Sequence, residues 1–275
     1  DRLKAQGHEV VDLSDETAAG ASDRALAGIA AGLDVLAVTG GDGTVNLGVN
    51  LCAGTGTVLA IVAGGTGNDI ARALHLPLHD ASAAAEVISG GAVRAIDVGR
   101  HTDVHGVEHW FAGVLGAGFD SLVNERANTW GWPRGRMRYN LAIARELPVF
   151  KPIPYVIEVD GVRHTAEAML VAVGNGPSYG GGMRVCPDAS FDDGLFDILV
   201  VNRISTIEFL KVFPKVFSGR HIGHPAIQIL RGREVRLEAA GIIGYADGER
   251  FAPLPMSCQV VPAALNVLVP GPDVA

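Results

Sequence analysis

The stretch "TGGDGTVNLGVN", residues 39–50, places two glycines, an aspartate and a third glycine directly after an apolar run. That run, "DVLAVTG" (34–40), is typical of a parallel strand that is covered on both faces. Glycines let the main chain turn sharply and approach a ligand closely, and free amides at a helix start favour an anion. We therefore predict a strand, a glycine corner (40–44) and a helix (44–53), with Asp42 inside the turn.

A second corner of the same kind follows in the sequence. The apolar run "TVLAIVA" (57–63) leads into "GGTGND" (64–69), and a helix is expected over 68–74. In an open α/β sheet, ligands bind beyond the carboxyl ends of the strands. Two such corners predict a phosphate-binding edge. Neither contains the lysine of a P-loop, and the second lacks the third glycine of a dinucleotide fingerprint.

Strand and helix signals alternate along the first part of the chain. A strand is expected over 8–13, a helix over 21–33 with Ser22 as its N-cap, and a further helix over 80–89. This alternation predicts an α/β domain whose parallel sheet is flanked by helices, over residues 1–95.

The pattern changes after residue 95. Short strand signals separated by Gly, Pro and Asp occur at 155–161, 168–175, 195–201, 233–239 and 258–262, and helices are expected around 136–147 and 205–218. We predict a second domain over 96–275, which is mainly an antiparallel β-sandwich.

Composition limits the classes of function. The chain has 275 residues and a formal charge of −8, which argues against nucleic acid as a partner because such binding depends on Lys and Arg. The three cysteines are far apart, the chain opens with no signal peptide, and no apolar run approaches the roughly 20 residues of a membrane span. We therefore expect a cytoplasmic protein.

Four segments in order resemble one known family. "GGDGTVN" (40–46), "GGTGNDIARAL" (64–74), "VGNGPSYGGGMRVCPDASFDDGLFDILVV" (173–201) and "YADGE" (245–249) are similar to the motifs of the diacylglycerol kinase catalytic-domain family. The match is closest to its soluble bacterial lipid kinases. The resemblance implies an ATP-dependent enzyme that transfers the γ-phosphate to a hydroxyl of diacylglycerol or a similar lipid.

The resemblance also assigns roles to residues. Hydroxyl and amide side chains such as Thr44, Asn46 and Thr66 can donate to phosphate oxygens, and Arg72 can neutralise charge. The expected nucleotide contacts are Thr17, Gly41, Asp42, Gly43, Thr44, Val45, Asn46, Thr66, Asn68, Asp69 and Arg72. The expected catalytic residues are Glu249 as the base, Asp247 near the metal, and Asp42.

Magnesium is the expected metal, since it prefers oxygen ligands. Asp42, Asp69 and Asp247 are candidates for organising the Mg²⁺ that accompanies ATP. The resemblance implies a second, structural Mg²⁺ held by the Asp193 side chain and the carbonyls of Ser190 and Leu195.

The chain departs from the family pattern in two places. Family members usually begin with a strand and an NP-x-x-G loop, and we expect the α/β domain to lack this first strand. Leu47 stands where the family has Glu after the Asn of GGDGTxN. Two alternatives stay open: a nucleotide kinase resembling NAD kinase, which shares the GGDGT corner, and a non-catalytic nucleotide- or lipid-binding protein.

Two further segments bear on partners. Residues 126–145 hold five arginines, two tryptophans and a tyrosine, which is typical of a surface that meets anionic lipid headgroups. We expect a lipid substrate at a membrane surface and peripheral association with it, and the sequence leaves a homodimer open. His101, His105 and His109 are spaced like helical metal ligands, but their context favours a hairpin.

Overall fold

The computed structural model describes all residues except 1, 129–140, 142–144, 146–150 and 272–275.

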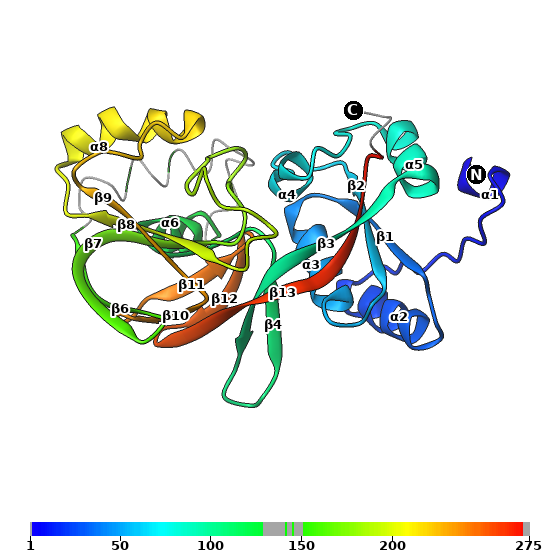
Figure 1. The fold of residues 1–275 in the computed structure, drawn as a ribbon, viewed down its shortest axis with the longest axis horizontal. Coiled ribbons are helices and arrows are strands. Elements are labelled where there is room, and N and C mark those ends of the chain that lie inside the picture. Colours follow the sequence, from blue (N-terminus) through cyan, green and yellow to red (C-terminus); the bar gives the residue numbers. More distant parts are fainter. Residues whose placement is uncertain (1, 129–140, 142–144, 146–150, 272–275) are drawn as a thin grey trace.

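The N-terminal half is an α/β layer in which helices surround two parallel strands (Figure 1). Strands β1 (Val35–Gly40) and β2 (Val58–Ala63) pair in parallel and in register along their whole length. The helices of this half are α1 (Arg2–Ala5), α2 (Ala18–Ala30), α3 (Asp42–Cys52), α4 (Asp69–Ala73) and α5 (Ala81–Gly90). Because the two strands are parallel neighbours, their carboxyl ends, and with them both glycine corners, lie at the same edge of the sheet.

The second half is built mainly from antiparallel strands, as predicted. They are β4 (Glu108–Phe111), β5 (Val114–Gly118), β6 (Ile153–Val159), β7 (Val162–Gly174), β8 (Phe196–Asn202), β9 (Ile227–Gly232), β10 (Glu234–Glu238), β11 (Ile243–Ala246) and β12 (Glu249–Pro253). The largest of them, β7, pairs with β5, β6 and β8. Three helical elements belong to this half: α6 (Phe119–Asn128), α8 (Thr206–Val212) and the 3₁₀ helix η1 (Phe213–Ser218).

Two long strands join the halves. β3 (Ala92–Thr102) and β13 (Met256–Val269) pair antiparallel and cross between the two sides of the molecule (Figure 1). The start of β13 pairs with β10, and Val267 near its end pairs in parallel with Leu59 of β2. The end of the chain therefore returns to the α/β half. The predicted domain boundary at residue 95 stays a prediction.

Local predictions failed where tertiary contacts decide the structure. The strand predicted over 8–13 is wrong: these residues form no strand, and Val11 is 60% exposed. Strands need a pairing partner, which alternation alone cannot supply. The predicted N-cap Ser22 lies inside α2, and Thr17 caps that helix instead. The hairpin predicted over 101–109 is confirmed, since His101 of β3 pairs with His109 of β4. Most of the helix predicted around 136–147 lies outside the described residues, and the two that are described, Leu141 and Arg145, are helical.

The hydrophobic core has a separate cluster for each part of the fold. One cluster surrounds β1, β2 and α3, and a second fills the inside of the β-rich half, with Phe111, Phe196 and Tyr155 buried. A third lies under α8. None of the described helices combines the length and the hydropathy needed to cross a bilayer.

Candidate active site

The two glycine corners touch one another. A Cβ atom added at Gly65 would lie 2.3 Å from the Cα of Gly41, so glycine is required for the corners to approach this closely. Asn68 adopts a left-handed conformation with φ of 56°, and its side chain bonds both the amide and the carbonyl of Gly65. The second corner is therefore held in one shape by its own residues.

Asp42 binds the first corner to the second. Its carboxylate accepts hydrogen bonds from the main-chain N–H groups of Asn68 at 3.0 Å and Asp69 at 2.8 Å. Burial raises the pKa of Asp42; the amide of Asp69 opposes this rise and the negative charge of Asp69 adds to it. The Asp42 side chain thus holds the two corners together, and it also places a carboxylate at the site.

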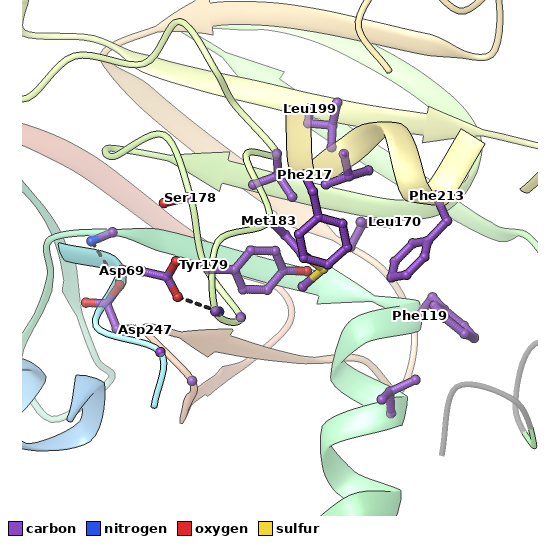
Figure 2. A pocket seen from close by; sticks show the side chains of 18 of the residues that line it. Asp69, Phe119, Leu170, Ser178, Tyr179, Met183, Leu199, Phe213, Phe217 and Asp247 are labelled. Atoms are coloured by element: carbon purple, nitrogen blue, oxygen red, sulfur yellow. Dashed lines mark hydrogen bonds between the residues drawn. The ribbon is translucent and has the colours of Figure 1, made fainter. Parts of the chain in front are cut away.

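Asp69 connects the α/β half with the β-rich half. Its buried carboxylate accepts 2.7 Å hydrogen bonds from the N–H groups of both Gly181 and Gly182 (Figure 2). Gly180, Gly181 and Gly182 all have positive φ, between 65° and 101°, a conformation that favours glycine. The sequence analysis missed this contact, although the GGG run at 180–182 was its signal.

Asp247 is a second buried carboxylate at the site. It accepts hydrogen bonds from three consecutive N–H groups, those of Ala112, Gly113 and Val114, at 2.9 to 3.1 Å. The amide of Asn46 donates a fourth at 3.3 Å. Burial raises the pKa of Asp247 to about 6, and these hydrogen bonds act in the opposite direction. Asn46 therefore contacts a site carboxylate, which brings α3 to the predicted catalytic motif.

The side chain of Glu249 lies beside the first turn of α3. A Cβ atom at Gly43 would lie 2.7 Å from Oε1 of Glu249, and the Glu249 side chain is exposed. Glu249 is the first residue of β12, two residues after Asp247, and the turn between them has positive φ at both Asp247 and Gly248. Because of this turn, Asp247 points toward residues 112–114 and Glu249 points toward Gly43.

These residues line one end of a pocket of about 470 Å³. The polar end contains Asp42, Gly43, Thr66, Gly67, Asp69, Asp247 and Glu249. The other end is apolar and is lined from the β-rich half by Phe119, Leu170, Met183, Leu199, Phe213 and Phe217, among others. Figure 2 shows Asp69 and Asp247 at one end and these apolar side chains at the other. A single cavity thus joins a carboxylate cluster to a hydrophobic chamber.

Several residues that were predicted to contact the nucleotide interact with the protein itself. Thr17 caps α2 by accepting the Gly20 N–H at 3.0 Å, and Arg72 donates to the carbonyl of Gly67 at 2.8 Å. The hydroxyl of Thr44 lies against Gly40, and Val45 is 2% exposed. These residues, and also Gly41, Asn46 and Asn68, do not line the pocket, so their contact with a nucleotide stays a prediction.

The residues predicted for a structural magnesium make other contacts. One Asp193 oxygen accepts the N–H of Leu195 at 3.0 Å, and the other pairs with Arg231. The Ser190 hydroxyl donates to Asp192 at 2.6 Å. The Asp193 carboxylate is thus partnered by the protein itself, and the structural Mg²⁺ stays a prediction. Among the described residues no group of three or more His, Cys, Asp or Glu is arranged to hold a metal.

The comparisons with known proteins follow the two halves of the fold. A diacylglycerol kinase catalytic domain model matches residues 2–101, and a model of the YegS C-terminal NAD kinase beta sandwich-like domain matches residues 113–269. A diacylglycerol kinase of Mycobacterium tuberculosis is 43% identical over 270 residues, which cover 98% of this chain and 87% of that protein. The chain belongs to the diacylglycerol kinase family.

More distant relatives in the diacylglycerol kinase family agree. The diacylglycerol kinase of Bacillus subtilis is 30% identical over 241 residues, which cover 86% of this chain and 78% of that protein. A crystal structure of a diacylglycerol kinase from Bacillus anthracis superposes with a TM-score of 0.69 at 23% identity, covering 95% of this chain and 85% of that chain. Another crystal structure from that organism reaches 0.74 at 25% identity with the same two coverages. The fold of the family is therefore the fold described here.

Proposed function

We propose that the protein is an ATP-dependent lipid kinase that phosphorylates the free hydroxyl of diacylglycerol or a similar two-chain lipid. The observation that carries this proposal is the shape of the pocket: carboxylates and glycine corners at one end, and an aromatic and aliphatic chamber at the other. A phosphorylated product with two acyl chains needs both ends in one cavity. Family membership supports ATP as the phosphate donor.

The nucleotide phosphates would bind at the two corners. The N-cap of α3 is Gly41, which makes no side-chain cap bond among the described residues. The N–H of Thr44 bonds the carbonyl of Gly41 at 3.0 Å, so an anion would be held by the positive end of the α3 dipole beside Gly43, which lines the pocket. Thr66 lines the same end of the pocket and can donate its hydroxyl to a phosphate oxygen.

Glu249 is the proposed base. As the acceptor oxygen attacks the γ-phosphorus, the bond from that phosphorus to the β–γ bridging oxygen breaks, ADP leaves, and the hydroxyl proton passes to Glu249. The carboxylate of Glu249 is exposed and borders the pocket, whereas Asp247 is buried with a raised pKa of about 6 and accepts four hydrogen bonds from the protein. The buried Asp247 instead holds residues 112–114 against the pocket, which is a positioning role.

Magnesium is proposed with the nucleotide. The carboxylates of Asp42 and Asp69 both lie close to Gly67, where an added Cβ would be 2.2 Å from an Asp42 oxygen and 3.6 Å from an Asp69 oxygen. The charge of Asp69 helps to raise the pKa of Asp42, and a divalent cation would relieve this repulsion. When bound, the ion would neutralise charge on the transferred phosphate.

A nucleotide acceptor is the second candidate, because one half of the chain matches a model named for NAD kinase. The apolar chamber argues against it, since Phe119, Leu199 and Phe213 offer a nicotinamide nucleotide no polar partner. We further propose that the protein works in the cytoplasm and associates peripherally with a membrane, where its lipid substrate is found.

A test compares acceptors with one donor. Purified protein, radiolabelled ATP and Mg²⁺ are incubated separately with dioleoylglycerol in mixed micelles, a sphingoid base, ceramide and NAD. We expect label in phosphatidic acid and none in NADP. Transfer to NAD alone would replace the proposal with the nucleotide kinase, and tight ATP binding without transfer to any acceptor would favour a non-catalytic protein.

A further inference from the structure

The segment formed by α8 and η1 is apolar on two opposite sides. Phe209, Val212 and Phe213 point toward the pocket and help to line it. On the other side, Ile207 is 69% exposed and Leu210 is 57% exposed. Ile207 and Leu210 are three residues apart and so share one face of α8. Apolar side chains on a helix normally face the protein interior, yet α8 lies at the outer edge of the β-rich half and exposes two of them (Figure 1).

Phe217 connects the inner and the outer side. It lines the pocket and is also 45% exposed, so the apolar wall of the cavity continues onto the outer surface at this residue. Phe209, Phe213 and Phe217 contact each other in sequence, with ring centroids 5.6 and 6.2 Å apart. One aromatic row thus runs from the apolar end of the pocket to the exposed ring of Phe217, and Figure 2 shows Phe213 and Phe217 of this row.

The charge of this segment is opposite to that of the chain. The formal charge of the whole chain is −8, whereas residues 203–224 hold the basic residues Arg203, Lys211, Lys215 and Arg220 and the acidic residue Glu208. The carboxylate of Glu208 lies 3.2 Å from Nε2 of His224. Within the described part of the chain, neither Lys211 nor Lys215 takes part in an ion pair, so both ammonium groups remain available to an anionic partner.

The exposed apolar residues at the tip of the β3–β4 hairpin lack these two features. Val104 is 96% exposed and Val107 is 51% exposed at the tip of the β3–β4 hairpin, but neither lines the pocket. The hairpin tip also has Asp103 and no Lys or Arg between residues 102 and 108. The hairpin tip therefore serves as a matched control for the surface on α8 and η1.

We infer that Ile207, Leu210, Lys211, Lys215 and Phe217 form a docking face for the surface of a bilayer that contains anionic lipid. The apolar side chains enter the region below the headgroups, the lysines contact phosphate groups, and the aromatic row leads the acceptor lipid into the chamber. This combination of apolar and basic side chains on one helix is typical of an interfacial segment. The inference rests on the proposed function for its substrate, but the binding itself can be measured without catalysis.

The first experiment measures vesicle binding in the absence of ATP and diacylglycerol. The wild type, Ile207→Glu/Leu210→Glu, Lys211→Glu/Lys215→Glu and the control Val104→Glu/Val107→Glu are each mixed with phosphatidylcholine vesicles, with or without phosphatidylglycerol, and then sedimented. We expect the wild type and the control to bind anionic vesicles. Both α8–η1 variants should bind more than about tenfold more weakly. Thermal unfolding would establish that all four proteins are folded.

The second experiment measures activity on two forms of substrate. With monomeric dihexanoylglycerol, kcat/KM should be equal in the wild type and the Ile207→Glu/Leu210→Glu variant. With dioleoylglycerol in anionic vesicles, the variant should lose about tenfold or more. If the wild type phosphorylates neither lipid, the proposed function fails while the binding result still decides the docking face.

Two outcomes would overturn the inference. One is vesicle binding by Ile207→Glu/Leu210→Glu as strong as that of the wild type. The other is a wild-type dimer that these substitutions convert to a monomer with no change in vesicle binding, which would assign the face to a second copy of the chain.

Discussion

The carboxylate of Asp42 accepts a 2.8 Å hydrogen bond from the main-chain N–H of Asp69, 27 residues further along the chain. Asp69 in turn accepts the N–H groups of Gly181 and Gly182. The carboxylate of Asp42 thus links the first corner to the second, and the carboxylate of Asp69 links the second corner to the β-rich half. The pocket depends on this connection, because both corners contribute to its polar end and the β-rich half forms its apolar end.

Asp42→Asn tests the first of these bonds. Both carboxylate oxygens accept an N–H group, and the Asn amide nitrogen cannot, so one donor loses its partner. We expect a loss of about 1–3 kcal/mol in the free energy of unfolding and a loss of kinase activity of about 100-fold or more. Urea unfolding and initial rates measure the two effects, with Asp23→Asn on exposed α2 as the control. Wild-type activity in the Asp42 variant would remove this carboxylate from the account.

Gly65→Ala tests the contact between the corners. The new Cβ would meet the Cα of Gly41 at 2.3 Å, so the corners must separate, whereas at Gly64 a Cβ would meet no atom within 4 Å. Gly65→Ala should reduce the free energy of unfolding by about 1–3 kcal/mol and weaken ATP binding. Gly64→Ala should change stability by less than about 1 kcal/mol. Equal melting temperatures for the two variants would show that the close approach is unimportant.

The sequence predicted the corners but not the bonds that hold them. Glycine spacing after an apolar strand is local information, and it placed both corners at one sheet edge. The Asp42–Asp69 bond and the Asp69–Gly181 bond depend on how distant segments meet, which no local pattern encodes. The sequence also did not predict that the hydroxyl of Thr17 caps α2; the contact of Thr17 with a nucleotide stays a prediction.

The apolar chamber also lay beyond the sequence analysis, although part of its signal was present. Phe209, Phe213 and Phe217 recur every four residues, which places them on one side of a helix. Phe119 and Leu170 join them from separate elements, and only the tertiary fold brings these together. The return of β13 to pair with β2 was missed because a parallel partner more than 200 residues away leaves no local trace.

Asp247 should make stability depend on pH. Its pKa is raised from 3.8 to about 6 in the folded protein, so it binds its proton more tightly when folded. The resulting stabilisation is fully present below about pH 4 and is lost as the pH rises through 6. Relative to Asp247→Asn, the wild type should lose up to about 3 kcal/mol between pH 4 and pH 7. Urea unfolding of both proteins without divalent cations measures this difference, and a difference that does not change with pH would contradict it.

Leu170→Trp tests the chamber. Leu170 lines the apolar end, so the larger indole should occupy space needed by an acyl chain. We expect KM for dioleoylglycerol to rise about tenfold, with a smaller change for dihexanoylglycerol and none for ATP. Val162→Trp, at a 58% exposed position on the same strand, is the control. If both lipids were affected equally, the chamber would not be the acyl-chain site.

The most direct test of the central claim is phosphate transfer by wild type and Glu249→Gln. The wild type should convert radiolabelled ATP and dioleoylglycerol to phosphatidic acid. Glu249→Gln should be slower by about 10²- to 10⁴-fold with unchanged ATP affinity, because only the proton acceptor is lost. Glu238→Gln, which removes a surface ion pair with Arg236, should retain full activity. Undiminished turnover by Glu249→Gln would contradict the claim that this carboxylate serves as the base for lipid phosphorylation.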